Sequence, residues 1–166
     1  MKVSILLFLT FITLITSDAM HDNAYYIYTF FTEKGWSLNS ISAVLGNMQA
    51  ESNITFDIDN TNENGGYGLL QWNPKSILVD WANTYGLDYK VLETQCSRIL
   101  WELENDEVFQ NTTAYPITFR EFSYSYYSPS YLAKIFLYNY FQKEDPNEQN
   151  RLNWASKWYN SFRRWD

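Results

Sequence analysis

The feature that most constrains the fold of this chain is a run of apolar residues at helical spacing. A stretch that cannot continue a helix follows it. After Ser37, a residue type that caps helices, apolar side chains recur every three or four positions as far as Met48. Residues 53–68 then contain four Asn, three Asp or Glu and three Gly. We therefore expect a helix that ends near Glu51 and Ser52, followed by an irregular loop or a short β-hairpin.

Similar apolar spacing and capping residues predict further helices along the chain. The expected helices cover residues 22–34, 37–51, 73–86 and 88–103, a turn that starts at Thr118, and residues 128–141 and 147–163. A chain of 166 residues suits one domain, with no internal repeat or linker. We expect a mainly α (α+β) domain over residues 20–166, in which helices accompany a small irregular or β-hairpin lobe.

The first residues have the pattern of a secretory signal peptide. Lys2 precedes the apolar run 3–15, which at about 1.5 Å per residue is too short to cross about 30 Å of hydrocarbon. Small residues at Ser17 and Ala19 fit a cleavage site. We expect removal of residues 1–19, then secretion to the outside or to a vacuole or phagosome, without stable membrane association. An uncleaved anchor and a buried core helix are the alternatives.

Charge and composition exclude several classes of function. The chain has 12 Lys and Arg against 19 Asp and Glu, a net charge of −7, which argues against nucleic acid as a partner. Cys96 is the only cysteine, so no internal disulfide forms, and its position predicts a buried, inert thiol. His21 is the only histidine, so His-based triads and multi-His metal sites lack their residues. We expect no metal and no cofactor.

Glu51 is the side chain best placed for chemistry. It lies at the expected C-terminal end of an apolar helix, where the macrodipole disfavours an exposed negative charge by ~0.3–1 kcal/mol. Apolar surroundings would favour the protonated carboxyl further. A carboxyl that keeps its proton near neutral pH can donate it to a leaving oxygen as a general acid. From position alone, a solvated glutamate at a frayed helix end is the alternative.

Residues 67–73, YGLLQWN, complete a wider pattern that begins at Glu51-Ser52. Together the two pieces resemble the lysozyme superfamily, and most closely the lysozyme domain of phage tail-tip proteins. The likeness runs from Tyr25 to Tyr159, and it rests on the order and spacing of several short matches. The other matching pieces include Gly35-Trp36, Leu45–Gln49, Trp81–Asn83, Ile99–Glu102, Thr118-Phe119 and Leu132-Ala133.

The resemblance implies a lysozyme-like fold with a saccharide cleft, and Glu51 as the acid that protonates a glycosidic oxygen. It also implies that Tyr67, Gln71 and Trp72 bind the saccharide. Aromatic rings cover the apolar faces of sugars, and an amide both donates and accepts hydrogen bonds. Core packing of the two rings and a structural hydrogen bond from the amide are the alternatives. The implied partner is the peptidoglycan glycan strand of bacterial cell walls, and we expect a monomer.

One position departs from the superfamily pattern. Animal-type lysozymes carry an Asp directly before the Tyr-Gly pair, where this chain has Gly66. A two-carboxylate hydrolase needs its groups ~5–5.5 Å apart for retention or ~6.5–9.5 Å apart for inversion. The loop offers Asp57, Asp59 and Glu63 as partners. Without a partner, the N-acetyl group of the substrate assists or an anhydro product forms, as in lytic transglycosylases. A non-catalytic saccharide binder is the remaining alternative.

Two further features carry predictions of their own. An acidic protein is repelled by anionic cell walls, so we expect activity at acidic pH, where carboxylates are protonated. The tyrosines within residues 124–131 form either a sugar platform or ordinary packing. Asn53 and Asn111 begin Asn-x-Thr triplets, which accept glycans in a eukaryotic host.

Overall fold

The central helix of the fold is α2 (Leu38–Glu51). The computed structural model describes residues 19–52 and 55–164, so residues 1–18 of the expected signal segment and Asn53 lie outside the described residues. The Ser37 hydroxyl accepts the Ser40 N–H at 3.1 Å, which confirms the predicted cap. Every residue from Ser40 to Gln49 is buried. The helix is therefore covered on all sides, and not only along the apolar stripe that the sequence suggests.

Two helices provide most of this cover, α6 (Pro129–Phe136) and α7 (Glu148–Phe162). α2 and α7 cross closely at Gly46, where an added Cβ would lie 2.5 Å from the Arg151 carbonyl oxygen. Such a distance excludes any side chain unless the helices separate. Gly46 therefore sets how closely the end of α2 that carries Glu51 approaches α7.

The other helices agree broadly with the sequence prediction. They are residues 19–33, α3 (Ser76–Thr84), α4 (Leu92–Glu104), α5 (Phe119–Ser123) and the π-helix η1 (Leu137–Phe141). The Thr118 capping box is confirmed, with Glu121 accepting the Thr118 N–H at 2.9 Å. α3 begins at Ser76 and not at Pro74, and the helix predicted to reach Phe141 changes to π geometry after Phe136.

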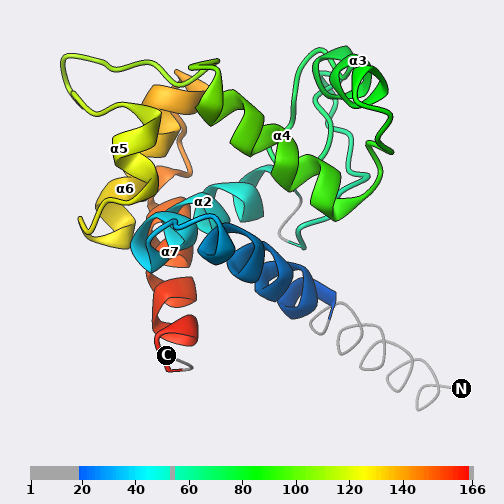
Figure 1. The fold of residues 1–166 in the computed structure, drawn as a ribbon. Coiled ribbons are helices and arrows are strands. Elements are labelled where there is room, and N and C mark those ends of the chain that lie inside the picture. Colours follow the sequence, from blue (N-terminus) through cyan, green and yellow to red (C-terminus); the bar gives the residue numbers. More distant parts are fainter. Residues whose placement is uncertain (1–18, 53–54, 165–166) are drawn as a thin grey trace, which may run out of the picture.

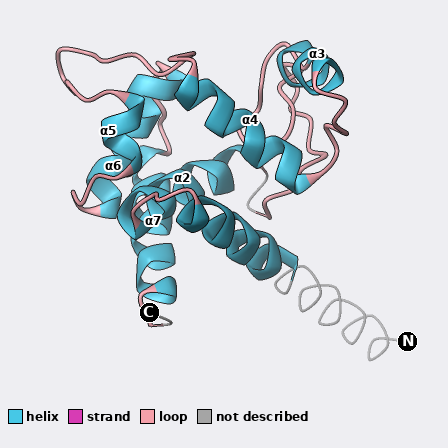
Figure 2. Cartoon of the chain, viewed as in Figure 1, coloured by secondary structure: helices cyan, strands magenta, loops and turns pink. Residues whose placement is uncertain are grey.

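The segment between α2 and α3 is irregular. The described residues contain two isolated β-bridges, Thr61 with Tyr67 and Tyr67 with Trp72, and no extended strand (Figure 2). The β-hairpin alternative is thus not confirmed. Tyr67 and Trp72 exchange both backbone hydrogen bonds at 3.0–3.1 Å, around a turn in which Gly68 has a φ of +76°. A Cβ at Gly68 would lie 2.6 Å from the side-chain oxygen of Gln95, so α4 packs directly on this turn.

The arrangement in space separates two regions around the central helix. Figure 1 shows α3 and the irregular segment on one side, α5 and α6 on the other, and α4 running between them. One continuous hydrophobic core joins these parts. Within residues 19–52 and 55–164, no helix is long and apolar enough to span a membrane.

Candidate active site

Glu51 is the last residue of α2, and its carboxylate is enclosed by two cations. Its Oε1 lies 2.6 Å from Arg151 Nη2 of α7 and 2.8 Å from Lys143 Nζ of the loop before α7. Only 9% of the Glu51 side chain is exposed. Glu51 is therefore neither in the apolar surroundings that would favour its protonated form nor the solvated glutamate of the alternative, because two of its partners are cations. Opposite charges at this distance stabilise a carboxylate.

Arg151 joins the two helices that meet at this site. Its side chain is 4% exposed, and Nη2 contacts Asp145 Oδ2 at 2.6 Å as well as Glu51. Nη1 donates to Asn47 Oδ1 at 3.2 Å, so two separate positions of α2 are tied to α7. Partial burial raises the pKa of Asp145, but the hydrogen bonds from the Asn147 N–H and Arg151 outweigh it, so the pKa is lowered overall.

Sequence reasoning missed Arg151, although a signal for it exists. In α7 the buried residues are Arg151, Ala155, Trp158 and Phe162, at steps of four, three and four. Arg151 thus shares the inward stripe of its helix, and a charge on such a stripe needs a buried partner. Lys143 and Asp145 lie in a loop, where no periodic pattern indicates their position.

Gln71 is connected to Glu51 through Asn60. The Asn60 amide donates to the Glu51 backbone oxygen at 3.3 Å, and the Asn60 carbonyl accepts from Gln71 Nε2 at 3.3 Å. Gln71 Nε2 also donates to the Gly68 carbonyl at 2.8 Å. Its Oε1 is buried and has no hydrogen-bond partner among the described residues. Buried acceptors without a partner are rare in proteins, and a ligand N–H or O–H can reach this atom only if the packing around Gln71 opens.

Tyr67 and Trp72 are buried, and their polar atoms are used inside the protein. The Tyr67 hydroxyl donates to Asp59 Oδ1 at 2.5 Å, and Trp72 Nε1 donates to Glu102 Oε1 at 2.8 Å. Lys75 Nζ also lies 3.8 Å from the centre of the Tyr67 ring. In this structure the two rings therefore pack within the core and do not face solvent.

The three loop carboxylates proposed as partners of Glu51 serve other purposes or face solvent. Asp57 accepts the Asp59 N–H at 2.9 Å and so stabilises a turn. The hydrogen bond from Tyr67 lowers the pKa of Asp59, and Lys90 contributes to the same effect. Glu63 is exposed. Among the described residues, no hydrogen bond or ion pair joins any of the three to Glu51.

A second buried carboxylate, Glu102, was also missed. It accepts hydrogen bonds from Arg98 Nε at 3.0 Å and from the Tyr140 hydroxyl at 2.6 Å, in addition to Trp72. Removal from water raises the pKa of Glu102, and these hydrogen bonds offset part of the increase. Three segments meet here: α4, η1 and the turn that carries Gln71. The cluster is therefore a structural junction behind the candidate site.

Cysteine and histidine contribute no site to the described part of the chain. Cys96 is fully buried, as predicted, and burial raises the pKa of its thiol. The ring of His21 packs edge-on against Trp158, with 5.4 Å between the ring centres. Among the described residues, no group of three or more His, Cys, Asp or Glu could hold a metal ion.

Comparison with known proteins places this geometry in context. The family model described as phage tail lysozyme matches residues 22–162. Over 144 residues the chain is 38% identical to Morphogenesis protein 1 of Bacillus phage B103. That match covers 84% of this chain and 39% of the relative, so the chain spans well under half the length of the relative.

Proposed function

The chain belongs to the phage tail lysozyme family, and from this premise we propose that it cleaves glycosidic bonds in peptidoglycan glycan strands. We assign Glu51 as the general acid. The observation that carries the proposal is the position of Glu51 at the end of a helix that is buried from Ser40 to Gln49. The Glu51 backbone oxygen is joined through Asn60 to the side-chain nitrogen of Gln71, whose Oε1 has no partner among the described residues.

The two oxygens of Glu51 are suited to different tasks. Among the described residues, both cations bind Oε1, and no hydrogen bond reaches Oε2. Arg151 thus orients the carboxyl group, and Oε2 is free to hold the proton that passes to the glycosidic oxygen. Lys143 is 44% exposed, so an entering glycan can displace it at little cost. Its departure opens the Glu51 carboxyl group to the substrate.

Gln71 is proposed to bind the substrate directly. Its Oε1 can accept an N–H of an acetamido group or a sugar hydroxyl, which satisfies the buried acceptor. Because Tyr67 and Trp72 are buried, we propose that they fix the backbone that carries Gln71, and do not stack on sugar themselves.

The hydrogen bonds and ion pairs that the neighbouring carboxylates already make favour particular routes. Asp57 and Asp59 are engaged in the loop, and the carboxylate that shares a cation with Glu51 is Asp145, which Arg151 already binds. Routes that use no second carboxylate therefore fit best. These are assistance by the substrate N-acetyl group and the formation of an anhydro product, as in a lytic transglycosylase.

Digestion of purified peptidoglycan, with mass analysis of the fragments, tests the proposal. Hydrolysis gives reducing ends, and transglycosylation gives anhydro ends. Glu51→Gln should lower turnover by a factor of about 10²–10⁴ and still bind glycan. Glu63→Gln makes the same chemical change at an exposed carboxylate and should keep full activity. A wild-type protein that binds glycan without cleaving it would instead establish the saccharide-binder alternative.

We also propose that the chain acts outside the cytoplasm. The apolar run 3–15 and the small residues that follow it support export with cleavage after Ala19. The net charge of −7 supports an acidic working environment. Mass analysis of the protein collected from the medium should give a chain that begins at Met20, and a chain retained in the cell with Met1 intact would contradict export.

A further inference from the structure

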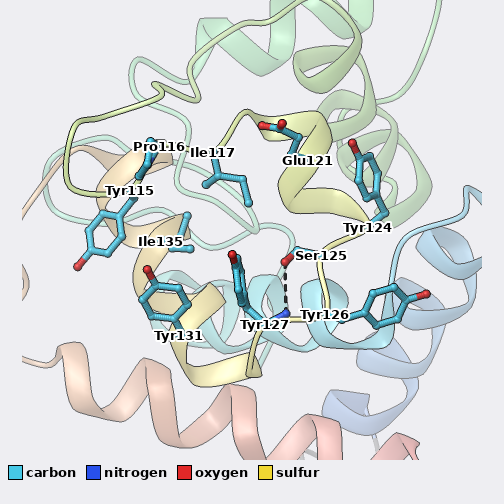
Figure 3. Close-up of a pocket in the computed structure, with 10 residues that line it drawn as sticks. All are labelled: Tyr115, Pro116, Ile117, Glu121, Tyr124, Ser125, Tyr126, Tyr127, Tyr131 and Ile135. Atoms are coloured by element: carbon cyan, nitrogen blue, oxygen red, sulfur yellow. Dashed lines mark hydrogen bonds between the residues drawn. The ribbon is translucent and has the colours of Figure 1, made fainter.

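The residues drawn in Figure 3 line a groove of about 740 Å³. The groove lies at the opposite end of α2 from Glu51, because Asn39, near the start of the helix, donates to the Tyr127 carbonyl. Tyr131 comes from α6, Tyr115 from the segment before α5, and Tyr124, Tyr126 and Tyr127 from the loop between α5 and α6. We call this surface the tyrosine groove. At about 1.5 Å per residue, the 14 residues of α2 separate it from Glu51 by about 20 Å.

Large rings of the tyrosine groove are open to solvent. Tyr126 is 84% exposed and Tyr127 is 59% exposed. Among the described residues, no hydrogen bond satisfies the hydroxyl of any of its five tyrosines. Clustered exposed rings are unusual on a protein surface and commonly mark a binding site. The rings offer apolar faces, and the hydroxyls offer both donors and acceptors.

The backbone beneath these rings is held in place from behind. The Ser37 N–H donates to the Ser123 carbonyl at 2.9 Å, and Asn39 Nδ2 donates to the Tyr127 carbonyl at 2.9 Å. On the other wall, the buried Asn139 donates to the Tyr115 carbonyl at 3.0 Å. Both walls are thus tied to helices of the core. A ligand would meet a preorganised surface, which lowers the entropic cost of binding.

The charge of the groove restricts its ligand. No Lys or Arg is among the described residues that line it, so these residues lack the groups that recognise phosphate or a polyanion. Its one charged residue, Glu121, accepts the N–H and the hydroxyl of Thr118, and these bonds lower the pKa of Glu121. The carboxylate is therefore committed to the helix cap. A ligand that matches this surface is uncharged, rich in hydroxyl groups and flat on at least one apolar face.

We propose that the tyrosine groove binds an uncharged oligosaccharide, as a second saccharide site separate from the Glu51 site. Sugar rings would stack on the exposed tyrosines, while their hydroxyls bond to the phenol groups. The assignment of N-acetylated hexosamines as the sugar rests on the proposed function. Simultaneous occupation of both sites would hold one glycan network at two points and increase its residence time.

Titration calorimetry with the soluble hexamer of N-acetylglucosamine tests this assignment in a Glu51→Gln background. The double change Tyr126→Ala and Tyr127→Ala should weaken one binding event about tenfold or more. Both side chains are exposed, so the fold should persist, as circular dichroism can verify. Tyr26→Ala is the matched control, because Tyr26 is 38% exposed on the helix over residues 19–33, away from the groove.

The outcomes separate this inference from the proposed function. Unchanged hexamer affinity in the double variant would overturn the second site, as would binding that Gln71→Ala alone abolishes. If the groove binds another protein and no sugar, the hexamer affinity of the double variant should be unchanged, which also overturns the proposal. If the wild type fails to cleave peptidoglycan, the proposed function is wrong, yet loss of hexamer binding in the double variant would still support the groove.

Discussion

The two ends of α2 present opposite surfaces. At the C-terminal end, the Glu51 carboxylate is enclosed by Arg151 and Lys143, and the nearby aromatic rings of Tyr67 and Trp72 are buried. At the N-terminal end, tyrosine rings stand in solvent around a groove without a basic residue. One end is nearly closed around an ion pair, and the other is open and has Glu121 as its charged residue among the described lining residues.

This difference shows that the type of an aromatic residue does not predict whether its side chain is exposed to solvent. The aromatic residues within the recognised segment 67–73 serve as internal anchors, since each donates a hydrogen bond to a carboxylate. The aromatic residues of the loop after α5 match no motif, yet they are the exposed ones. Tertiary contacts, such as the bond from Trp72 to Glu102 of α4, contribute to which rings are buried.

The largest expected contrast is between Trp72→Ala and Tyr126→Ala. Loss of the buried Trp72 ring leaves a cavity and removes a donor from Glu102, so the free energy of unfolding should fall by about 3–5 kcal/mol. Tyr126→Ala should change it by no more than about 0.5 kcal/mol, because the ring is exposed. Urea unfolding measures both values. Equal losses of unfolding free energy in the two variants would contradict the difference in burial between the two rings.

The charged end contains its own contrast, between Arg151 and Lys143. Arg151→Ala leaves Glu51 and Asp145 without their shared buried cation, so we expect a loss of about 3 kcal/mol or more in unfolding free energy. Lys143→Ala removes an exposed partner and should cost only about 0–1 kcal/mol. The same unfolding measurement applies. A large loss in Lys143→Ala would mean that this lysine is a structural part of the site.

Gly46→Ala should perturb the Glu51 end of α2 and leave the tyrosine groove at the other end unchanged. The new Cβ would lie 2.7 Å from the Ala155 nitrogen, so α2 and α7 must separate at a cost of about 1–3 kcal/mol. Because Arg151 moves with α7, peptidoglycan cleavage should decline with stability, while hexamer binding by the tyrosine groove persists. Calorimetry and fragment analysis on one preparation report both. Loss of hexamer binding in parallel would show that the two ends are coupled.

The smallest effect concerns acid sensitivity. The pKa of Asp145 is lowered in the folded protein, so its contribution to stability is present above the ordinary value of 3.8 and is lost as the pH falls through the lowered pKa. Asp145→Asn should cost about 1 kcal/mol at neutral pH, and the difference from wild type should shrink below pH 3.8. Urea unfolding across pH provides the test, and a pH-independent difference would contradict the assignment.

Local signals made much of the fold predictable. The caps at Ser37 and Thr118 were predicted because each bonds to a backbone N–H three residues away. The start of α3 was placed two residues early, because Asn73-Pro74 fits a helix start as well as a loop. The lysozyme resemblance drawn from Glu51-Ser52 and residues 67–73 is confirmed by the family match. Those pieces are contiguous or nearly so, which is why the sequence alone reveals them.

The surroundings of Glu51 were not predictable in the same way. Lys143 and Arg151 approach it from 92 and 100 residues further along the chain. Periodicity places a residue on a helix face, but it does not state which other helix that face meets. The burial of Trp72 likewise depends on Glu102, which lies 30 residues away. The roles of Tyr67, Gln71 and Trp72 in binding sugar stay predictions.

The bond between Arg151 and Glu51 has a consequence for the order of events on the ribosome. α2 is synthesised long before α7, at a rate of about 5–20 residues per second. Until α7 emerges and docks along Gly46, nothing orients the Glu51 carboxyl group, and the narrow crossing at that glycine stays open. A nascent chain therefore carries Glu51 without its buried cation partner for several seconds, and this end of α2 is completed only when α7 docks.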